Sequence, residues 1–189
     1  NYISISHSKK LHELAKKHDA FLIGPGIGKR SGKIINSLIK NLNHIPKVID
    51  ADAIKMIRLQ DTDNSIITPH RKEYSILLKN SKINDTTELL KNNIIIKKAP
   101  VDEIISKYGL LYNKTGNPGM TKAGTGDVLA GLAAGFIAQG MDMIQSAKNA
   151  AFINGYIGDL LLKQKKGYFY IASDLINDLE KIQKKLQPK

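Results

Sequence analysis

The 189-residue sequence contains no cysteine, few arginines and no long apolar run. Without cysteine the chain can form neither disulfides nor thiolate metal sites, which fits a cytoplasmic protein. No apolar stretch approaches the roughly 20 residues that a membrane-spanning helix needs. The first residues, NYIS, lack the basic and apolar regions of a signal peptide, and they do not include a methionine. These absences predict a cytoplasmic protein that does not bind a membrane.

The charge balance is strongly basic, with a net charge of +12 at pH 7. Lysine supplies nearly all of the excess, because Arg30, Arg58 and Arg71 are the only arginines. The lysines are scattered along helical stretches and do not alternate with aromatic residues, as they do in many modules that bind RNA or DNA. We therefore expect a basic surface that attracts anionic ligands, and no nucleic-acid partner.

Short apolar runs alternate with helical periodicities along the chain. Strands are expected at residues 20–23 (a buried strand), 47–49, 65–68, 93–97, 103–106 and 109–113. Helices are expected at residues 11–17, 32–42, 51–59, 73–79, 86–91, 128–139, 146–163 and 173–186. This alternation predicts one α/β domain over residues 1–189, with a mostly parallel sheet and helices on both faces. In such sheets ligands bind outside the carboxyl ends of the strands.

The stretch 113–140, NKTGNPGMTKAGTGDVLAGLAAGFIAQG, is the most informative. Its centre, Gly124-Thr125-Gly126-Asp127, lies where a glycine-rich loop gives way to a helix. Helix N-termini bind anions through unpaired N–H groups, and glycines let the backbone close around a phosphate. Asp127 would repel a phosphate, but it is well placed to take a proton from a hydroxyl that attacks one. One loop thus offers both an anion site and a base for phosphoryl transfer.

Four further stretches each follow an expected strand. Residues 24–28 (GPGIG) are either a tight turn or a ligand loop, and they lack the third glycine of the dinucleotide fingerprint. In residues 50–53 (DADA), Asp50 and Asp52 could bind a magnesium ion or a substrate hydroxyl, or cap the next helix.

The other two stretches are equally open. His70, in TPH with Glu73 three residues later, could bond a ligand or serve the structure alone. Residues 97–102 (KKAPVD) could bring a lysine to a nucleotide's phosphates or form a plain β-turn. In the central stretch, residues 117–119 (NPG) suit a type II turn.

Taken in order, GPGIG, DADA, TPH-x-x-E, KAPVD and NKTGNPGMTKAGTGDVLAG resemble the ADP/ATP-dependent NAD(P)H-hydrate dehydratase family, which has a ribokinase-like fold. The resemblance spans about residues 20–140, and its TGNPGM…GTGDVLAG block is highly specific. It implies a lyase that repairs hydrated NADH and NADPH, written NAD(P)HX. The family uses ADP, giving AMP and phosphate, or ATP in eukaryotes. The KAPVD segment resembles bacterial and archaeal members, which favours ADP as the phosphoryl donor.

The resemblance also implies roles for individual residues. Asp127 would be the catalytic base, and the NAD(P)HX-binding positions fall on Gly28, His70 and Asp127. The nucleotide-binding positions fall on Lys98, Ala99, Pro100, Val101, Asp102, Gly124, Thr125 and Gly126. Mg²⁺ would neutralise the phosphates, with Asp52 as a candidate to hold its waters. Family members often assemble as tetramers, so a homo-oligomer is expected.

The sequence departs from the family pattern in three respects. Roughly the opening third of the family domain is absent. Lys72 and Ala99 stand where members usually have glycine, and Ala123 replaces a glycine that often precedes GTGD. We therefore expect the chain by itself to bind nucleotide but to be weakly active or inactive.

Two alternatives to the dehydratase remain open. The first is a vitamin-precursor kinase of the same fold, because such kinases share a glycine-rich anion hole and an aspartate base. The TGNPGM and TPH segments favour the dehydratase over it. The second is a non-catalytic nucleotide-binding remnant, which the absent segment, Lys72 and Ala99 suggest.

Overall fold

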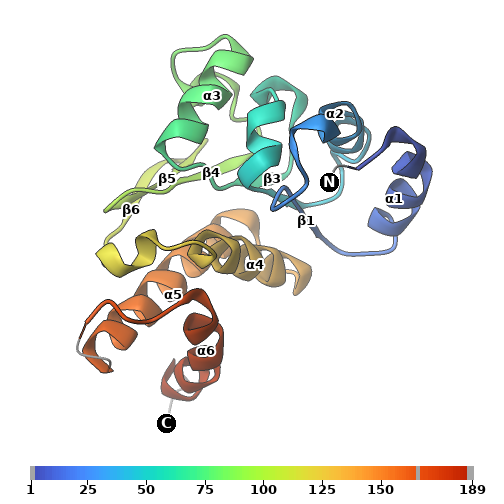
Figure 1. Cartoon of the computed structure of the whole chain (residues 1–189). Helices are drawn as coiled ribbons and strands as arrows, with labels where there is room; N and C mark the ends of the chain where they lie inside the picture. Colours follow the sequence, from blue (N-terminus) through green and yellow to red (C-terminus); the bar gives the residue numbers. More distant parts are fainter. Residues whose placement is uncertain (1–2, 165–166, 187–189) are drawn as a thin grey trace.

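The computed structural model describes residues 3–164 and 167–186, shown from blue to red along the chain in Figure 1. The strands are β1 (Phe21–Ile23), β2 (Lys47–Ile49), β3 (Ser65–Ile67), β4 (Ile94–Lys97), β5 (Asp102–Ser106) and β6 (Gly109–Asn113). The α-helices are α1 (Ser8–Ala15), α2 (Gly32–Asn41), α3 (Arg71–Ser81), α4 (Thr125–Ala138), α5 (Met143–Gln164) and α6 (Ala172–Leu186). Six short 3₁₀ helices are η1 (Ile5–His7), η2 (Lys29–Ser31), η3 (Ala51–Met56), η4 (Leu59–Asp61), η5 (Thr86–Leu89) and η6 (Pro118–Thr121).

The six strands form one sheet in the order β1-β2-β3-β4-β5-β6. The strands β1 to β4 are parallel, and β5 is antiparallel to both of its neighbours. It follows that β6 runs in the same direction as β1 to β4, so five strands end at the same edge of the sheet. The expected mostly parallel sheet is confirmed, and the hairpin of β5 and β6 is its antiparallel part.

Helices cover both faces of the sheet, as expected (Figure 1). The helices α2 and α3 lie on one face, over a core that includes Ile35, Ile49 and Ile95. The helices α4 and α5 lie on the other face, where Val48 and Ile96 point. The last helix, α6, packs on α4 and α5 and not on the sheet. Within the described residues, no helix is long and apolar enough to cross a membrane.

Two of the expected helices and one expected strand differ from the structure. The single helix expected at residues 51–59 is two 3₁₀ helices, η3 and η4, separated by extended backbone at Ile57 and Arg58. This break lets both Ile57 and Leu59 reach the core, which one short α-helix would not allow. The helix expected at residues 86–91 is likewise the shorter 3₁₀ helix η5. The first strand is not fully buried, because β1 lies at the edge of the sheet and leaves Leu22 37% exposed.

A buried lysine begins β2. The side chain of Lys47 is enclosed, and its Nζ donates a hydrogen bond of 2.7 Å to the backbone oxygen of Asp63. Burial lowers the pKa of Lys47 from 10.5 to about 8, and the Asp63 carboxylate offsets part of this effect. The ammonium is the form that burial disfavours, so the folded protein releases its proton more readily than the unfolded chain does.

Stability should therefore depend on pH through Lys47. Between pH 8 and pH 10.5 the unfolded chain holds this proton and the folded protein does not, so the free energy of unfolding rises with pH across that window. The rise should be on the order of 2 to 3 kcal/mol. Urea unfolding over this pH range would measure it, and Lys47→Met should remove it. An equal rise in the variant would contradict the assignment.

Candidate active site at the carboxyl edge of the sheet

The N-terminus of α4 leaves its first backbone N–H groups without a side-chain cap from the described residues. Gly124 precedes the helix with φ +90°, and a Cβ there would lie 2.8 Å from the Cβ of Ala172, so both backbone and space require glycine. The hydroxyl of Thr125 donates to the backbone oxygen of Met120 at 2.6 Å and folds the preceding loop against the helix. Within the described part of the chain no side chain caps this helix. Its first N–H groups therefore suit an anion.

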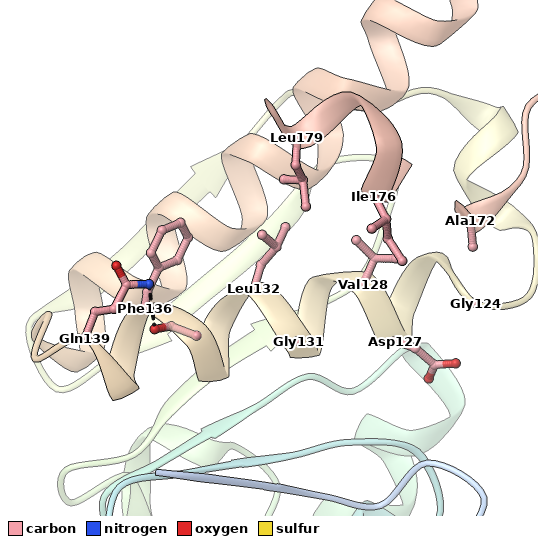
Figure 2. Close-up of a pocket in the computed structure, with 11 residues that line it drawn as sticks. Gly124, Asp127, Val128, Gly131, Leu132, Phe136, Gln139, Ala172, Ile176 and Leu179 are labelled. Carbon is pink, nitrogen blue, oxygen red and sulfur yellow. Dashed lines mark hydrogen bonds between the residues drawn. The ribbon is translucent and has the colours of Figure 1, made fainter. Parts of the chain in front are cut away.

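Asp127 lies in the first turn of α4 and is exposed. In Figure 2 its carboxylate points away from the side chains of Leu132 and Leu179. Those side chains line an apolar cleft of about 550 Å³ between α4 and α6. Gly124 and Asp127 also line this cleft, and the Asp127 carboxylate points from α4 toward the sheet.

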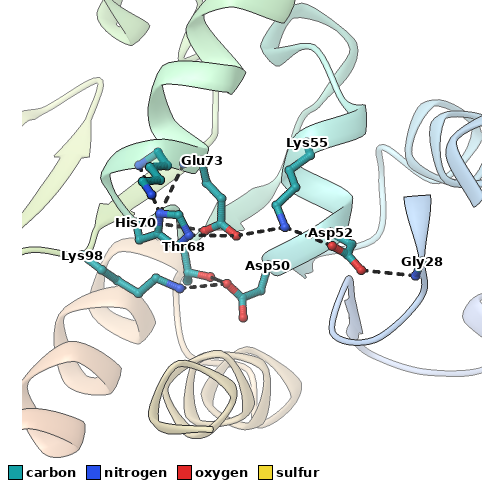
Figure 3. A network of polar contacts seen from close by, with 9 residues as sticks. Gly28, Asp50, Asp52, Lys55, Thr68, His70, Glu73 and Lys98 are labelled. Carbon is teal, nitrogen blue, oxygen red and sulfur yellow. Dashed lines mark hydrogen bonds and ion pairs between the residues drawn. The ribbon is translucent and has the colours of Figure 1, made fainter. Parts of the chain in front are cut away.

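The ammonium of Lys98 lies beside the same helix turn. Its Nζ is 3.0 Å from Oδ1 of Asp50, and a Cβ added to Gly126 would lie 3.3 Å from that Nζ. The hydroxyl of Thr68 donates to the same Oδ1 at 2.6 Å (Figure 3). Asp50 is buried and makes no side-chain bond that caps η3. Its carboxylate therefore holds Lys98 at the α4 terminus, and the capping role considered for Asp50 is wrong.

A second chain of polar contacts links the loop after β1 to the segments that follow β2 and β3 (Figure 3). The backbone N–H of Gly28 donates to Oδ2 of Asp52 at 3.2 Å. The other oxygen of Asp52 pairs with Lys55 at 3.0 Å, and Lys55 also lies 3.9 Å from Glu73. Glu73 in turn lies 3.5 Å from Nε2 of His70. The structure thus brings Gly28 and His70 into one network.

His70 has a structural role. Its Nδ1 accepts hydrogen bonds from the backbone N–H groups of Lys72 and Glu73, and the Glu73 carboxylate accepts one from the N–H of His70. This reciprocal arrangement is a capping box for α3. The imidazole is half exposed, and His70 pairs with Lys98 in an isolated β-bridge. The cap therefore fixes the ring beside the Lys98 strand end, with Nε2 on the side of Glu73.

The segment from Lys98 to Asp102 connects β4 to β5. Ala99, Pro100 and Val101 are exposed, so their backbone can reach a ligand. The Asp102 carboxylate accepts bonds from the N–H of Ala99 at 3.1 Å and from Nδ2 of Asn113 at 3.1 Å. Burial raises the pKa of Asp102, and these two bonds and the charge of Lys98 partly offset the rise. The carboxylate shapes the segment and does not face solvent freely.

Sequence reasoning missed the residues that hold the loop before α4. Asn117 caps η6, which replaces the expected type II turn. Its Oδ1 accepts a bond of 2.6 Å from the hydroxyl of Tyr170, and its Nδ2 donates to Asp159 at 3.0 Å. Lys122 donates to the backbone oxygens of Tyr168 and Tyr170. Asp159, Tyr168 and Tyr170 are all far from this loop in the sequence, so no local pattern could predict their contacts with it.

The glycines of α5 are the one sequence feature that could have indicated how this loop packs. A Cβ at Gly155 would overlap Thr115, and one at Gly158 would overlap Met120. Glycines three residues apart inside a helix indicate a close approach of another segment. Here that segment is the loop that leads to Gly124.

The carboxylates do not form a metal site of their own. Among the residues that the structure describes, no three His, Cys, Asp or Glu side chains are grouped to hold a metal ion. Asp52, the candidate from the sequence, already bonds Lys55 and the N–H of Gly28. A magnesium ion would therefore need oxygen ligands from bound phosphates.

Comparison with known proteins relates the chain to one protein family over nearly its whole length. A family model described as NAD(P)H-hydrate dehydratase matches residues 2–182. The bifunctional NAD(P)H-hydrate repair enzyme Nnr of Methanocaldococcus jannaschii is 40% identical over 192 residues, which cover 99% of this chain and 38% of that protein. The ADP-dependent (S)-NAD(P)H-hydrate dehydratase of Nitrosopumilus maritimus is 32% identical, with 94% of this chain and 66% of that protein covered.

Solved structures agree on the fold. A ribokinase-like superfamily protein from Enterococcus faecalis superposes with a TM-score of 0.82 and 26% identity, covering 97% of this chain and 69% of that one. The ADP/ATP-dependent NAD(P)H-hydrate dehydratase of Bacillus subtilis, co-crystallised with ATP/Mg²⁺, gives 0.77 with 23% identity, covering 89% and 65%. The chain is thus ribokinase-like and spans about two fifths of the bifunctional relatives it matches.

The ion pair between Asp50 and Lys98 should make a measurable contribution to the free energy of unfolding. Lys98→Met removes the ammonium and leaves a buried carboxylate without its cation, which should cost roughly 2 to 3 kcal/mol of unfolding free energy. Adding Asp50→Asn should recover much of that loss, because the charge is removed as well. Lys97→Met is the matched control, since Lys97 pairs with Glu103 near the surface and should cost less than about 1 kcal/mol. Additive effects of the two site substitutions would contradict the pairing.

Proposed function

We propose that this chain, which belongs to the NAD(P)H-hydrate dehydratase family, carries the site for ADP-dependent dehydration of NAD(P)HX to NAD(P)H, with AMP and phosphate as the other products. The observation that carries the proposal is the meeting of three groups at one edge of the sheet. These are the uncapped start of α4, the exposed Asp127 in its first turn, and Lys98 beside Gly126. An anion site, a base and a cation together are what phosphoryl transfer requires.

Asp127 is the proposed base. Its carboxylate is exposed and stands one residue beyond the glycine at which a transferring phosphate would bind. It would take the proton from the hydroxyl on the hydrated nicotinamide ring while the oxygen attacks the terminal phosphate of ADP. The phosphorylated hydroxyl would then leave as phosphate, and loss of a proton from the neighbouring ring carbon would restore the double bond.

The nucleotide would lie between α4 and the β4–β5 connection. Backbone N–H groups at Gly124, Thr125 and Gly126 would form the anion hole for the transferring phosphate. Lys98 would add a positive charge there, and the exposed backbone of Ala99, Pro100 and Val101, with Asp102 behind it, would meet the rest of the nucleotide. The related Bacillus subtilis dehydratase was co-crystallised with ATP/Mg²⁺, which is in keeping with a nucleotide site in this fold.

The NAD(P)HX side would be formed by Gly28, His70 and Asp127. Gly28 and His70 belong to one polar network, and the β-bridge to Lys98 joins that network to the nucleotide side. Because Nδ1 of His70 caps α3, the ligand would meet Nε2 or the backbone. Mg²⁺, when bound with the nucleotide, would neutralise phosphate charge, with Asp52 as the candidate to bond its waters.

We also propose a domain organisation, a cellular location and an oligomeric state for the protein. We take residues 1–189 as part of a single ribokinase-like dehydratase domain that works in the cytoplasm and assembles as a homo-oligomer, with a tetramer as the candidate size. Lys72 and Ala99 add bulk or charge near His70 and Lys98, as Ala123 does more mildly before Gly124. The isolated chain should therefore bind ADP but turn over slowly.

Recovery of near-ultraviolet NADH absorbance tests the function directly. The protein is mixed with NADHX and Mg²⁺, and with ADP in one arm and ATP in the other. Faster recovery with ADP would support the proposal and name the donor. Binding of ADP without any recovery would favour the non-catalytic remnant, and phosphorylation of a vitamin precursor in the same preparation would favour the kinase.

Asp127→Asn should separate chemistry from binding. It removes the base and a charge that repels phosphate, so kcat should fall by roughly 100-fold or more while ADP binds at least as tightly. Asp19→Asn, at an exposed position away from the site, is the matched control and should leave both unchanged. Near-native turnover in Asp127→Asn would show that another group is the base.

Gly126→Val should block the phosphate position. A Cβ at Gly126 already approaches Nζ of Lys98, and a branched side chain would fill the space above the helix start. ADP affinity, measured by calorimetry, should fall at least about tenfold. Gly131→Val in the same helix is the control, because its Cβ would meet open space. Equal ADP affinities for the two variants would refute the placement of the phosphate.

A further inference from the structure

The two ring nitrogens of His70 face groups of opposite hydrogen-bonding role. Nδ1 lies 3.1 Å from the backbone nitrogen of Lys72 and 3.3 Å from that of Glu73, and a backbone N–H group can only donate. Nε2 lies 3.5 Å from Oε1 of the Glu73 carboxylate, whose oxygens can only accept (Figure 3). A neutral imidazole carries one proton, on either nitrogen. At His70 that proton therefore belongs on Nε2.

The Glu73 carboxylate is fixed in the position from which it contacts the ring. Its side chain is buried, and Oε2 accepts the backbone N–H of His70 at 3.1 Å. Oε1 lies 3.9 Å from Nζ of Lys55, and that ammonium also pairs with Asp52 at 3.0 Å. A buried carboxylate needs such bonds and a nearby cation to remain charged. Glu73 thus holds both the backbone and the ring of His70.

We propose that Glu73 is a positioning residue that keeps His70 in the Nε2–H form, so that His70 donates a hydrogen bond to a carbonyl or phosphate oxygen of its ligand. The proposal rests on the proposed role of His70 in binding NAD(P)HX and adds the direction of the hydrogen bond. The imidazole is half exposed, and 3.5 Å is longer than an ordinary N–H···O bond. A better-placed ligand oxygen would therefore take over the Nε2–H.

This tautomer separates His70 from the proton transfers of the reaction. A general base must direct an unshared electron pair at the proton that it removes. The unshared pair of this imidazole lies on Nδ1, where it accepts the two N–H groups at the start of α3. A neutral histidine at a helix N-terminus can instead bind a substrate oxygen as a donor. His70 would therefore orient the substrate and would not remove the proton from the ring carbon.

His12 provides the opposite case within the same chain. Its Nδ1 lies 2.8 Å from the backbone oxygen of Ser8, which can only accept, so this nitrogen must carry the proton. Its Nε2 lies 3.4 Å from Nδ2 of Asn41, which is a donor. We therefore expect the Nδ1–H form for His12 and the Nε2–H form for His70. One spectrum of the protein contains both cases.

Long-range proton–nitrogen correlation spectra at about pH 8 test the proposal, because they distinguish the two tautomers of each histidine. The His70 signals are those that His70→Asn removes. Glu73→Gln should lower the fraction of the Nε2–H form, because the amide oxygen still completes the capping box while its NH₂ group faces Nε2 as a donor. Glu103→Gln is the matched control, since Glu103 pairs with Lys97, and it should leave the His70 tautomer unchanged.

Two results in the spectra would overturn the proposal. The first is a wild-type His70 in the Nδ1–H form or in a mixture of both forms. The second is an Nε2–H form that Glu73→Gln leaves unchanged, because the helix cap alone would then set the tautomer.

Binding of NADHX, measured by calorimetry, tests the donor role. His70→Asn keeps a cap on α3, because its amide oxygen can accept the same N–H groups, but it removes the Nε2–H. The Kd for NADHX should rise roughly three- to tenfold, while the Tm stays close to that of wild type. His44→Asn is the control, because His44 is exposed and precedes β2 at the opposite edge of the sheet. It should change neither quantity.

An unchanged Kd in His70→Asn would refute the donor role. A wild type that does not bind NADHX would instead contradict the proposed function. The spectra need neither substrate nor turnover, so they decide the role of Glu73 in either case.

Discussion

The ion pair between Asp50 and Lys98 is the contact around which the candidate site is arranged. Asp50, Thr68 and Lys98 directly follow β2, β3 and β4, so one carboxylate oxygen links the ends of three neighbouring strands. A buried carboxylate is stable only when its oxygens are bonded, and these bonds are available only if the strands keep this register. Lys98 then has a fixed position beside Gly126. The sheet and the start of α4 are thus held in one geometry by a contact in the interior.

Much of the fold could be predicted from local pattern, because strands and amphipathic helices leave their periodicity in the sequence. The sequence also predicted that the motifs after the strands would lie at one edge of the sheet, because parallel strands end at the same edge. What could not be predicted were the partners of particular side chains. Asp50 has the spacing of a helix cap, and only the fold shows that its carboxylate turns to Thr68 and Lys98. Tyr170, far along the chain from Asn117, gave no signal of its contact with it.

The glycines show the same division between local and tertiary causes. Position 124 requires glycine because its backbone has φ +90°, and the GTGD pattern predicts this requirement. Gly155 and Gly158 have ordinary helical backbone and are required by what lies against them, Thr115 and Met120. The first kind can be read from a motif. The second becomes clear only from the structure, in which the loop that leads to α4 packs on α5. This packing would hold the proposed anion site in place.

The positions of the lysines in the structure show how the positive net charge could act at the candidate site. Lys98 and Lys122 are both occupied, the first by Asp50 and the second by the backbone oxygens of residues 168 and 170. The site therefore does not present a bare cluster of cations. A phosphate would be attracted by the charge of the whole surface and then held by the N–H groups of α4. Lys98 would then lie between the phosphate and Asp50, and Thr68 would keep Asp50 bonded if the ammonium turned toward the nucleotide. The Thr68 hydroxyl would thus allow Lys98 to pair with Asp50 in the free protein and to contact a phosphate when a nucleotide binds.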